Sequence, residues 1–215
     1  RAQIGPELAA RAEQVLDVYA IDPIAFIETF CMIKMTEGGG MPRPFFLFDY
    51  QKDIILKIQE AENTNNDIEY LIDKPRGMGV TWVIAAYFLW RWLYTPNYSA
   101  FILSRTETEV DDGTRTADSC IFGKIRYMID HLPRWMLPEG YQPKGSKGTT
   151  TDATLKLINP SMQSALIGST TNSNAGRSRR YRTVFIDECF SIDRFSEVWR
   201  SLQSVSRLKL FVSTV

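Results

Sequence analysis

The sequence of 215 residues lacks an excess of charge of either sign, because 25 lysines and arginines balance 25 aspartates and glutamates. No global field therefore draws the chain onto nucleic acid or anionic lipid, and any such contact must be local. The sequence also has only three cysteines, Cys31, Cys120 and Cys189, which are far apart and not in metal-ligand spacing. This scarcity argues against a disulfide framework and a zinc site, and it fits a reducing cytoplasmic setting.

Long hydrophobic runs are missing as well. The longest, Val83 to Trp92, is interrupted by Arg91 and is much shorter than the ~20 residues that cross a bilayer. No secretory signal is present. With 44% hydrophobic and 23% charged residues, the composition is that of a soluble globular protein, and the simplest expectation is one α/β domain with additions. Because it begins with Arg1 and ends at Val215 in a strand-like run, we expect a fragment of a longer protein.

Hydrophobic periodicity predicts the order of the elements. Two helices are expected within residues 6–35, interrupted at Asp22-Pro23, and a loop or hinge over residues 37–44. Further helices are predicted over residues 46–58, 80–94, 107–131 and 195–204. Strands are predicted over residues 68–73, 99–104, 183–188 and 208–212, with a β-hairpin formed by residues 154–158 and 164–168.

The chain does contain a candidate phosphate-binding loop, at residues 74–81, with the sequence K-P-R-G-M-G-V-T. In the common pattern, G-x-x-x-x-G-K-[ST], backbone N–H groups hold phosphates, the lysine contacts the β/γ-phosphates and the hydroxyl contacts Mg²⁺. Val80 stands at the lysine position, whereas Lys74 occupies the first glycine position and Arg76 follows it. Either the charge has been relocated or the site is inactive. The simpler alternative is a glycine turn that binds nothing.

A second signal is the pair Asp187-Glu188, at the end of a predicted apolar strand. In nucleotide hydrolases of this design, the first carboxylate holds Mg²⁺, often through a water molecule, together with the loop hydroxyl, here Thr81, and the second polarises the attacking water. The alternative is that two acidic residues mark the exit of the strand to solvent.

Two weaker signals flank these motifs. Gln51, after Tyr50, could read the adenine edge while an aromatic side chain covers its face, although buried aromatics at a helix start explain the same residues. A basic loop before the acidic strand could contact DNA phosphates, supply an arginine finger to a γ-phosphate, or simply be solvated. Its four arginines are Arg177, Arg179, Arg180 and Arg182.

Together, the segment from Phe46 to Gln51, the loop, Asp187-Glu188 and the final Ser213-Thr214 resemble the ATPase domain of the large terminase subunit of tailed bacteriophages. The resemblance runs from about residue 45 to the end and rests on the order and spacing of four motifs. It implies a P-loop NTPase of the additional-strand type. We therefore expect a three-layer αβα sandwich with a mostly parallel sheet, in which the loop and Asp187 lie at the carboxyl ends of adjacent strands. Residues 1–44 would form an N-terminal helical segment and hinge, and residues 45–215 the ATPase domain.

The resemblance also implies roles for individual residues. Lys74 takes over the lysine role, with Arg76 as the other candidate, and Glu188 is the catalytic glutamate. Thr81 and Asp187 hold the metal. Arg177 acts on the ATP of a neighbouring subunit. The remaining nucleotide-binding residues are Tyr50, Gln51, Pro75, Gly77, Met78, Gly79 and Val80, and the coupling residues are Ser213 and Thr214.

The implied activity is hydrolysis of ATP with Mg²⁺, which drives double-stranded DNA into a procapsid in the host bacterial cytoplasm. The implied partners are the portal protein, the small terminase subunit and further copies of the chain in a ring, with no membrane involved. The family's C-terminal nuclease domain would follow Val215, so no nuclease activity is expected. Two alternatives stay open. A helicase-like ATPase would normally keep the loop lysine and need a second motor domain, and a nucleotide-binding or structural module would not hydrolyse ATP.

Overall fold

The computed structural model describes residues 17–34, 40–113, 120–146, 151–170 and 179–214. Its centre is a seven-stranded sheet in the order β3-β9-β8-β4-β7-β6-β5. Strands β3, β9, β8, β4 and β7 are parallel, β6 is antiparallel to β7, and β5 is antiparallel to β6. The strands are β3 Ile68–Lys74, β4 Ser99–Ser104, β5 Asp152–Ala153, β6 Lys156–Asn159, β7 Ser164–Thr170, β8 Thr183–Ile186 and β9 Leu208–Thr214.

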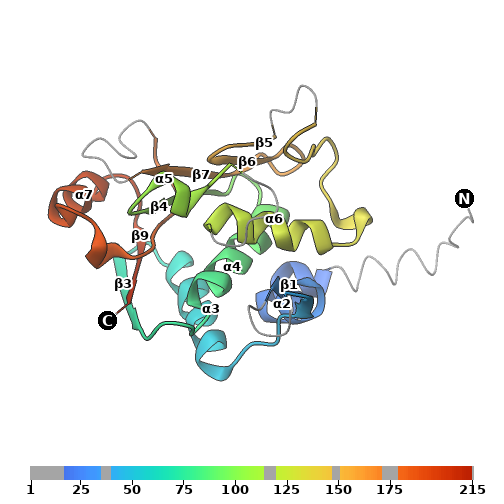
Figure 1. Ribbon diagram of the computed structural model, residues 1–215, viewed down its shortest axis with the longest axis horizontal. Helices are drawn as coiled ribbons and strands as arrows, with labels where there is room; N and C mark the ends of the chain where they lie inside the picture. The colour runs from blue at the N-terminus through green and yellow to red at the C-terminus, as the bar shows by residue number, and fades with distance from the viewer. Residues whose placement is uncertain (1–16, 35–39, 114–119, 147–150, 171–178, 215) are drawn as a thin grey trace, which may run out of the picture.

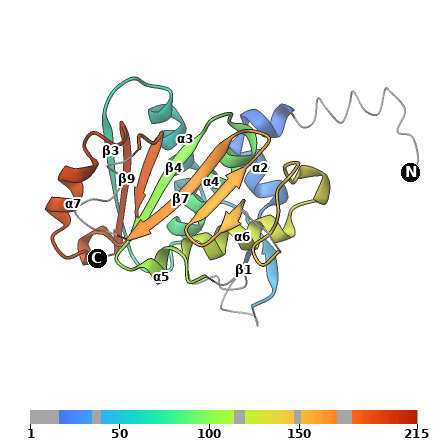
Figure 2. The same cartoon turned by 90° about the horizontal axis from the view of Figure 1, so that it is seen from above.

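Helices cover both faces of this sheet (Figures 1 and 2). The larger core lies between the sheet and helices α2, α3, α4 and α6, and the smaller core lies on the other face under α7. This arrangement confirms the predicted three layers. The helices are α2 Pro23–Phe30, α3 Asp49–Glu62, α4 Val80–Tyr94, α5 Glu107–Val110, α6 Ile121–His131 and α7 Phe195–Leu202, with 3-10 turns η1 Arg134–Met136 and η2 Cys189–Ser191.

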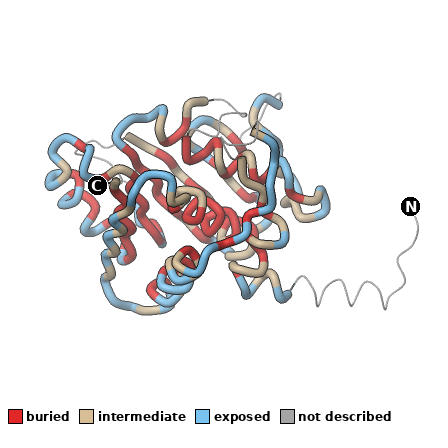
Figure 3. Tube along the Cα trace, turned by 60° about the horizontal axis from the view of Figure 1, so that its bottom comes forward, coloured by how far each residue is buried: buried red, intermediate tan, exposed pale blue. Residues whose placement is uncertain are grey.

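Helix α4 is the centre of the larger core because its sequence is apolar on nearly every side. Its run from Val83 to Trp90 is buried without interruption, and Trp92 is buried as well. A helix that is apolar all round is stable only when other elements surround it, as the helices and the sheet do here. Figure 3 shows the buried residues concentrated in the sheet and the central helix, with exposed residues on the outer turns. None of the described helices is long and apolar enough to cross a membrane.

The strand order corrects one sequence-based expectation. The loop strand β3 and the acidic strand β8 are not adjacent, because β9 lies between them and pairs in parallel with both. Strand β9 is buried from Leu208 to Ser213, as a strand covered on both faces and paired at both edges must be. The pairing sets Thr214 opposite Lys74.

The predicted helix over residues 107–131 is also wrong, because α5 ends at Val110. The side chain of Asp111 then turns into the protein, where it accepts two hydrogen bonds from Arg126, at 2.8 and 2.9 Å, and one from the backbone N–H of Leu155 at 2.7 Å. Both side chains of this ion pair are fully buried. A buried carboxylate with these partners fixes the chain in a turn that a continuous helix does not allow.

Part of the predicted hinge over residues 37–44 is a strand. Strand β2, Pro42–Pro44, pairs antiparallel with β1, Met32–Lys34, whereas residues 35–39 lie outside the described part of the chain. Most of the first predicted helix lies outside it too, and residues 17–21 are helical. Phe26 and Ile27 of α2 belong to the same core as α4. The division of the chain at residue 44 stays a prediction.

Candidate functional site

The candidate site lies where the parallel strands end. The carboxyl ends of β3, β9, β8 and β4 meet at one edge of the sheet, near α5 and the marked C-terminus in Figure 2. The sequence motifs follow those ends: the glycine loop follows β3, and Asp187-Glu188 follows β8. In open α/β sheets, ligands bind at this edge.

The glycine loop connects β3 directly to α4. Gly77 and Gly79 have φ angles of +82° and +68°, a conformation that other residues adopt at a cost. Gly79 is the N-cap of α4, and no described side chain caps this helix. The first N–H groups of α4 and the positive end of its dipole are therefore free to receive an anion.

The structure explains why valine replaces the usual lysine in the loop. Val80 is the first residue of α4, only 2% exposed, and its side chain belongs to the larger core. That side chain is therefore committed to packing, and a charge at this position would have to be buried. A cation at the loop would therefore have to come from another residue, and Lys74 and Arg76 are the predicted candidates.

Lys74 ends β3 and faces the acidic strand across β9. Its Nζ donates to Thr214 Oγ1 at 3.2 Å and lies 3.6 Å from Glu188 Oε1. The Thr214 hydroxyl in turn donates to Glu188 Oε1 at 2.8 Å. The described structure thus joins Lys74, the predicted catalytic glutamate and a predicted coupling residue in one group of polar contacts.

Thr81 and Asp187 form the second polar group. Thr81 Oγ1 donates to Asp187 Oδ2 at 2.9 Å. Burial raises the pKa of Asp187 above its ordinary value of 3.8, while the bond from Thr81 and the charge of Lys74 oppose this shift. Asp187 is 8% exposed, whereas the Glu188 side chain is 35% exposed, and Glu188 adopts a left-handed backbone conformation with φ 52°. Such strain is typical of functional positions.

These two side chains fit the predicted magnesium ion. A hydroxyl and a carboxylate are the oxygen ligands that Mg²⁺ accepts, and it usually takes only one or two from the protein beside substrate phosphates.

Gln51 and Tyr50 support the loop. The Gln51 Nε2 and the Tyr50 hydroxyl both donate to the carbonyl of Met78, at 3.0 and 2.7 Å, and Gln51 Oε1 accepts from the backbone N–H of Phe48. Gln51 is 3% exposed. Both ends of its amide are therefore bonded within the protein, and a role in reading adenine stays a prediction. Tyr50 and Met78 also line a cleft of about 280 Å³ on the α3 side of the loop.

A second cleft, of about 350 Å³, opens beside Lys74, Arg76, Gly77 and Glu188. Arg76 is exposed there, so its guanidinium faces solvent at the loop. Periodicity and motifs missed three further residues that line this cleft, Arg105, Glu109 and Ser191.

Arg105 and Glu109 form an ion pair at the start of α5, directly after β4. Glu109 also accepts bonds from the Ser104 hydroxyl at 3.1 Å and from the N–H of Thr106 at 3.2 Å. Although burial alone would raise the pKa of Glu109, the bonds from Arg105 and Ser104 hold it below its ordinary value. The signal that could have identified Arg105 is its place after a buried parallel strand, at the edge where the other motifs lie.

The arginine-rich loop divides between described and undescribed residues. Arg177 lies outside the described part of the chain, so its predicted action on a neighbouring subunit stays a prediction. Arg179, Arg180 and Arg182 come just before β8 begins, whereas Asp187 follows its end. These three arginines therefore approach the opposite edge of the sheet from the glycine loop.

The other predicted coupling residue, Ser213, is fully buried at the end of β9. Its hydroxyl accepts from the N–H of Phe190 at 3.3 Å, in the turn that follows Glu188. Together with the Thr214–Glu188 bond, this contact ties the end of β9 to the segment after the acidic pair. The coupling role itself stays a prediction.

Comparisons with known proteins identify a family and a fold. A family model described as the N-terminal part of the terminase large subunit, T4likevirus type, matches residues 71–214, which is more than half of the chain. No curated protein sequence matches. The large terminase of bacteriophage HK97 superposes with a TM-score of 0.62 at 18% identity, over 90% of this chain and 37% of that one. At 18% identity, this similarity shows that the two proteins share a fold and no more.

Two weaker structural similarities are also to phage terminases. A large terminase from a thermophilic bacteriophage has a TM-score of 0.49 at 12% identity, over 77% of this chain and 38% of that one. The ATPase domain of the Thermus phage P74-26 large terminase has a TM-score of 0.38 at 14% identity, over 72% and 62%. This chain therefore spans well under half of the length of the HK97 protein and of the protein from the thermophilic phage.

Proposed function

The chain belongs to the family of N-terminal domains of large terminase subunits of the T4-like type, and we propose that it binds and hydrolyses ATP with Mg²⁺. The observation that carries this proposal is the set of contacts at the carboxyl edge of the sheet. Lys74, Glu188 and Thr214 form one group, and Thr81 and Asp187 form the other, beside the uncapped start of α4. These are the cation, base and metal ligands that phosphoryl transfer to water needs.

Each residue has a role that follows from its position. The N–H groups at the start of α4 bind the phosphates of ATP, and Lys74 and Arg76 offset the charge that develops on the transferring phosphoryl group. Thr81 and Asp187 would hold Mg²⁺, which neutralises phosphate charge when it is bound. Glu188 orients a water molecule for attack on the terminal phosphorus and accepts its proton as the bond to ADP breaks.

Nucleotide binding has to rearrange the Lys74 group. In the structure Glu188 is held by the Thr214 hydroxyl and by the charge of Lys74. When a phosphate draws Lys74 away, Glu188 loses this ionic contact and its carboxylate can accept a hydrogen bond from the attacking water. Thr214 ends β9, so it is placed to pass this change to the strand, which is the coupling role predicted for Ser213 and Thr214.

We further propose that hydrolysis drives double-stranded DNA into a procapsid, as part of a ring of copies assembled on the portal protein with the small terminase subunit, in the host bacterial cytoplasm. The family supports this proposal. Arg177 would complete the site of the neighbouring copy. We propose no nuclease activity for residues 1–215.

The test is the variant Glu188→Gln, compared with the exposed α7 variant Glu197→Gln as a matched control. Removal of a general base costs about 100- to 10,000-fold in rate, so Glu188→Gln should lose nearly all ATP hydrolysis. Calorimetric titration should show that it still binds ATP and Mg²⁺, because Gln preserves the shape of the side chain. Glu197→Gln should behave as the wild type in both assays.

Two results would contradict the proposal in different ways. If Glu188→Gln hydrolysed ATP at the wild-type rate, the assignment of the base would be wrong. If the wild type bound ATP but did not hydrolyse it, even at high protein concentration or with the portal protein, the chain would be a nucleotide-binding module. A helicase-like activity would appear as ATP-dependent strand separation, which a terminase motor does not predict.

A further inference from the structure

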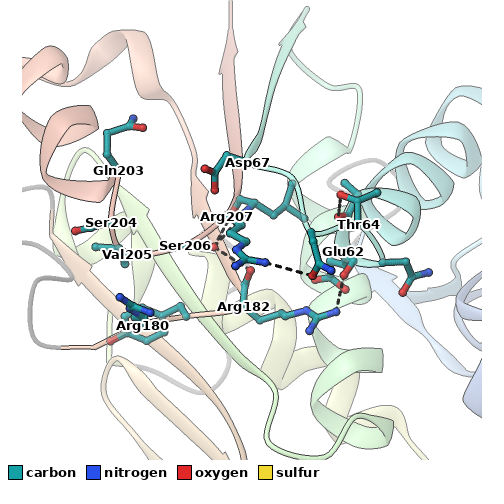
Figure 4. Close-up of a pocket in the computed structure, with 15 residues that line it drawn as sticks. Glu62, Thr64, Asp67, Arg180, Arg182, Gln203, Ser204, Val205, Ser206 and Arg207 are labelled. Carbon is teal, nitrogen blue, oxygen red and sulfur yellow. Dashed lines mark hydrogen bonds between the residues drawn. The ribbon is translucent and has the colours of Figure 1, made fainter.

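A pocket of about 520 Å³ lies at the amino edge of the sheet, opposite the candidate ATP site. It is formed by the turn from α3 to β3, the turn from α7 to β9 and the segment that leads into β8. Figure 4 shows that Arg180, Arg182 and Arg207 lie around it, and we call it the basic pocket. The three arginines come from different segments of the chain, so the fold has brought their charges together.

The arginines of the basic pocket are bonded only to uncharged oxygens. Arg182 Nη2 donates to the carbonyl of Glu62 at the end of α3, and Arg207 Nη1 donates to Asn65 Oδ1 at 3.2 Å. Among the described residues, Arg180 has no hydrogen-bond or ion-pair partner, and no carboxylate forms an ion pair with Arg182 or Arg207. A guanidinium has five N–H donors, so most of this donor capacity is unused.

Acidic groups in the basic pocket do not cancel the positive charge. Asp67 is exposed at the rim. The Glu62 carboxylate is buried beneath the pocket, where it pairs with Arg91 at 2.6 Å and accepts a bond from Tyr87 at 2.8 Å. Three arginines against one free aspartate leave a local excess of positive charge on a chain whose net charge is zero.

The chemistry of the lining favours phosphates over a peptide. The apolar residues that line the pocket, Ala61, Tyr181, Val205 and Leu208, are all buried, so the exposed lining is more polar than apolar and offers little to the apolar side chains of a partner protein. The planar guanidinium matches the geometry of phosphate oxygens. Contacts of this kind bind a nucleic-acid backbone without reading its sequence.

Two strands connect the basic pocket to the ATP site. Strand β8 begins directly after Arg182 and ends directly before Asp187, and β9 begins directly after Arg207 and ends at Thr214. Thr214 donates to Glu188. A ligand on the two arginines and a nucleotide at the other edge therefore contact the opposite ends of the same two strands.

We infer that the basic pocket binds the phosphate backbone of double-stranded DNA. This inference rests on the proposed function, since it assigns a surface to the DNA on which the motor would act. It also implies that DNA and ATP occupy opposite edges of the sheet and do not compete.

The experiment measures the binding of a short labelled DNA duplex by fluorescence anisotropy over a series of salt concentrations. The test variants are Arg180→Gln and the double variant Arg180→Gln/Arg207→Gln, and the control is Arg134→Gln, an exposed arginine outside the pocket. The double variant should bind about tenfold more weakly, and the slope of log affinity against log salt should fall by about 0.9 for each phosphate that is no longer neutralised. Arg134→Gln should match the wild type, and thermal melting should confirm that all variants are folded.

Several outcomes would overturn the inference. The inference fails if the wild type does not bind the duplex. It also fails if the double variant and the control Arg134→Gln bind the duplex equally well, whether both match the wild type or both are equally weakened. It also fails if an acidic polypeptide displaces the duplex as well as unlabelled DNA does, because the pocket would then be a site for acidic protein segments. Titration of the wild type with ATP separates a failure of this inference from a failure of the proposed function. A wild type that binds ATP but not the duplex overturns the pocket alone, and a wild type that binds the duplex but not ATP overturns the ATPase alone.

Discussion

At the carboxyl edge of the sheet the partly buried lysine is paired with a carboxylate, whereas at the amino edge the three arginines of the basic pocket form no ion pair with a described residue. Lys74 is paired with Glu188, and Thr81 is bonded to Asp187. Arg182 and Arg207 reach only a carbonyl and an amide oxygen. A phosphate at the carboxyl edge must therefore take Lys74 from an existing partner, while a phosphate at the amino edge breaks no ion pair.

The two edges of the sheet also differ in the kind of ligand that they suit. The carboxyl edge offers backbone N–H groups, a helix dipole and a partly buried lysine, which suit one small ligand in a defined geometry. The amino edge offers exposed, flexible side chains in an open pocket, which suit a repeating polyanion. The same strands, β8 and β9, connect both edges, so the sheet can serve as a rigid link between them.

The largest expected effect concerns the two cations of the carboxyl edge. Lys74→Ala removes a partly buried charge beside the phosphates and should weaken ATP binding by about 10- to 100-fold. Arg76→Ala removes an exposed charge and should weaken binding by about fivefold at most. Calorimetric titration of both variants with ATP and Mg²⁺ measures the difference. An equal or larger loss in Arg76→Ala would show that the arginine carries the relocated charge.

The next effect separates the geometry of the loop from its contacts. Gly77→Ala and Gly79→Ala both place a side chain on a backbone with positive φ, which costs about 1–2 kcal/mol each. Only at residue 79 does the new Cβ lie 3.2 Å from Gln51 Nε2, while nothing lies within 4 Å at residue 77. Gly79→Ala should therefore lose roughly 1 kcal/mol more, because the Gln51 bond to Met78 is disturbed. Urea unfolding measures both, and equal losses would mean that Gln51 does not hold the loop.

A smaller effect is expected at the amino edge. Arg182→Gln removes a charged donor from the carbonyl of Glu62 at the end of α3 and should cost about 1 kcal/mol of stability. Arg180→Gln removes no bond to a described residue, and its cost should stay below about 0.5 kcal/mol. Thermal unfolding of the two variants tests whether each arginine stabilises the fold or is available to bind a ligand. A large loss in Arg180→Gln would place that arginine in the fold rather than on a binding surface.

The smallest effect is a change in pH dependence. Because burial raises the pKa of Asp187 in the folded state, this carboxyl binds more protons in the native protein than in the unfolded chain between pH 3.8 and that raised value. Asp187 therefore contributes stability that is lost as pH rises through this window, and Asp187→Asn should remove that contribution. Urea unfolding of both proteins at several pH values measures it. The opposite result would be a wild type that gains stability relative to Asp187→Asn as pH rises through the same window. It would mean that the partners of Asp187 stabilise its carboxylate by more than burial destabilises it.

The sequence was sufficient to predict a helix or a strand where the pattern that specifies it lies within the element and its flanking turns. The bounds of α4 and β4 agree with the prediction, because the glycine turn before α4 and the apolar pattern of both segments fix where the helix and the strand begin and end. The sequence also places Asp187 after a buried strand. It does not indicate that β9 separates β3 from β8, because strand order depends on contacts between distant segments. The break after α5 was missed for the same reason, since Arg126 and Leu155 are the partners that turn Asp111 inward.

The sequence by itself determined which residue types stand in the motifs and so predicted the kind of site, because two glycines, a nearby lysine, a loop hydroxyl and two carboxylates each have a narrow chemical use. Only the tertiary structure decided which groups meet. It set Lys74 against Glu188 through Thr214, committed Gln51 to the loop, added Arg105 and gathered three arginines at the far edge. The physical reason is that residue chemistry is encoded locally, whereas the distance between charges is fixed by the pairing of strands that are far apart in the chain.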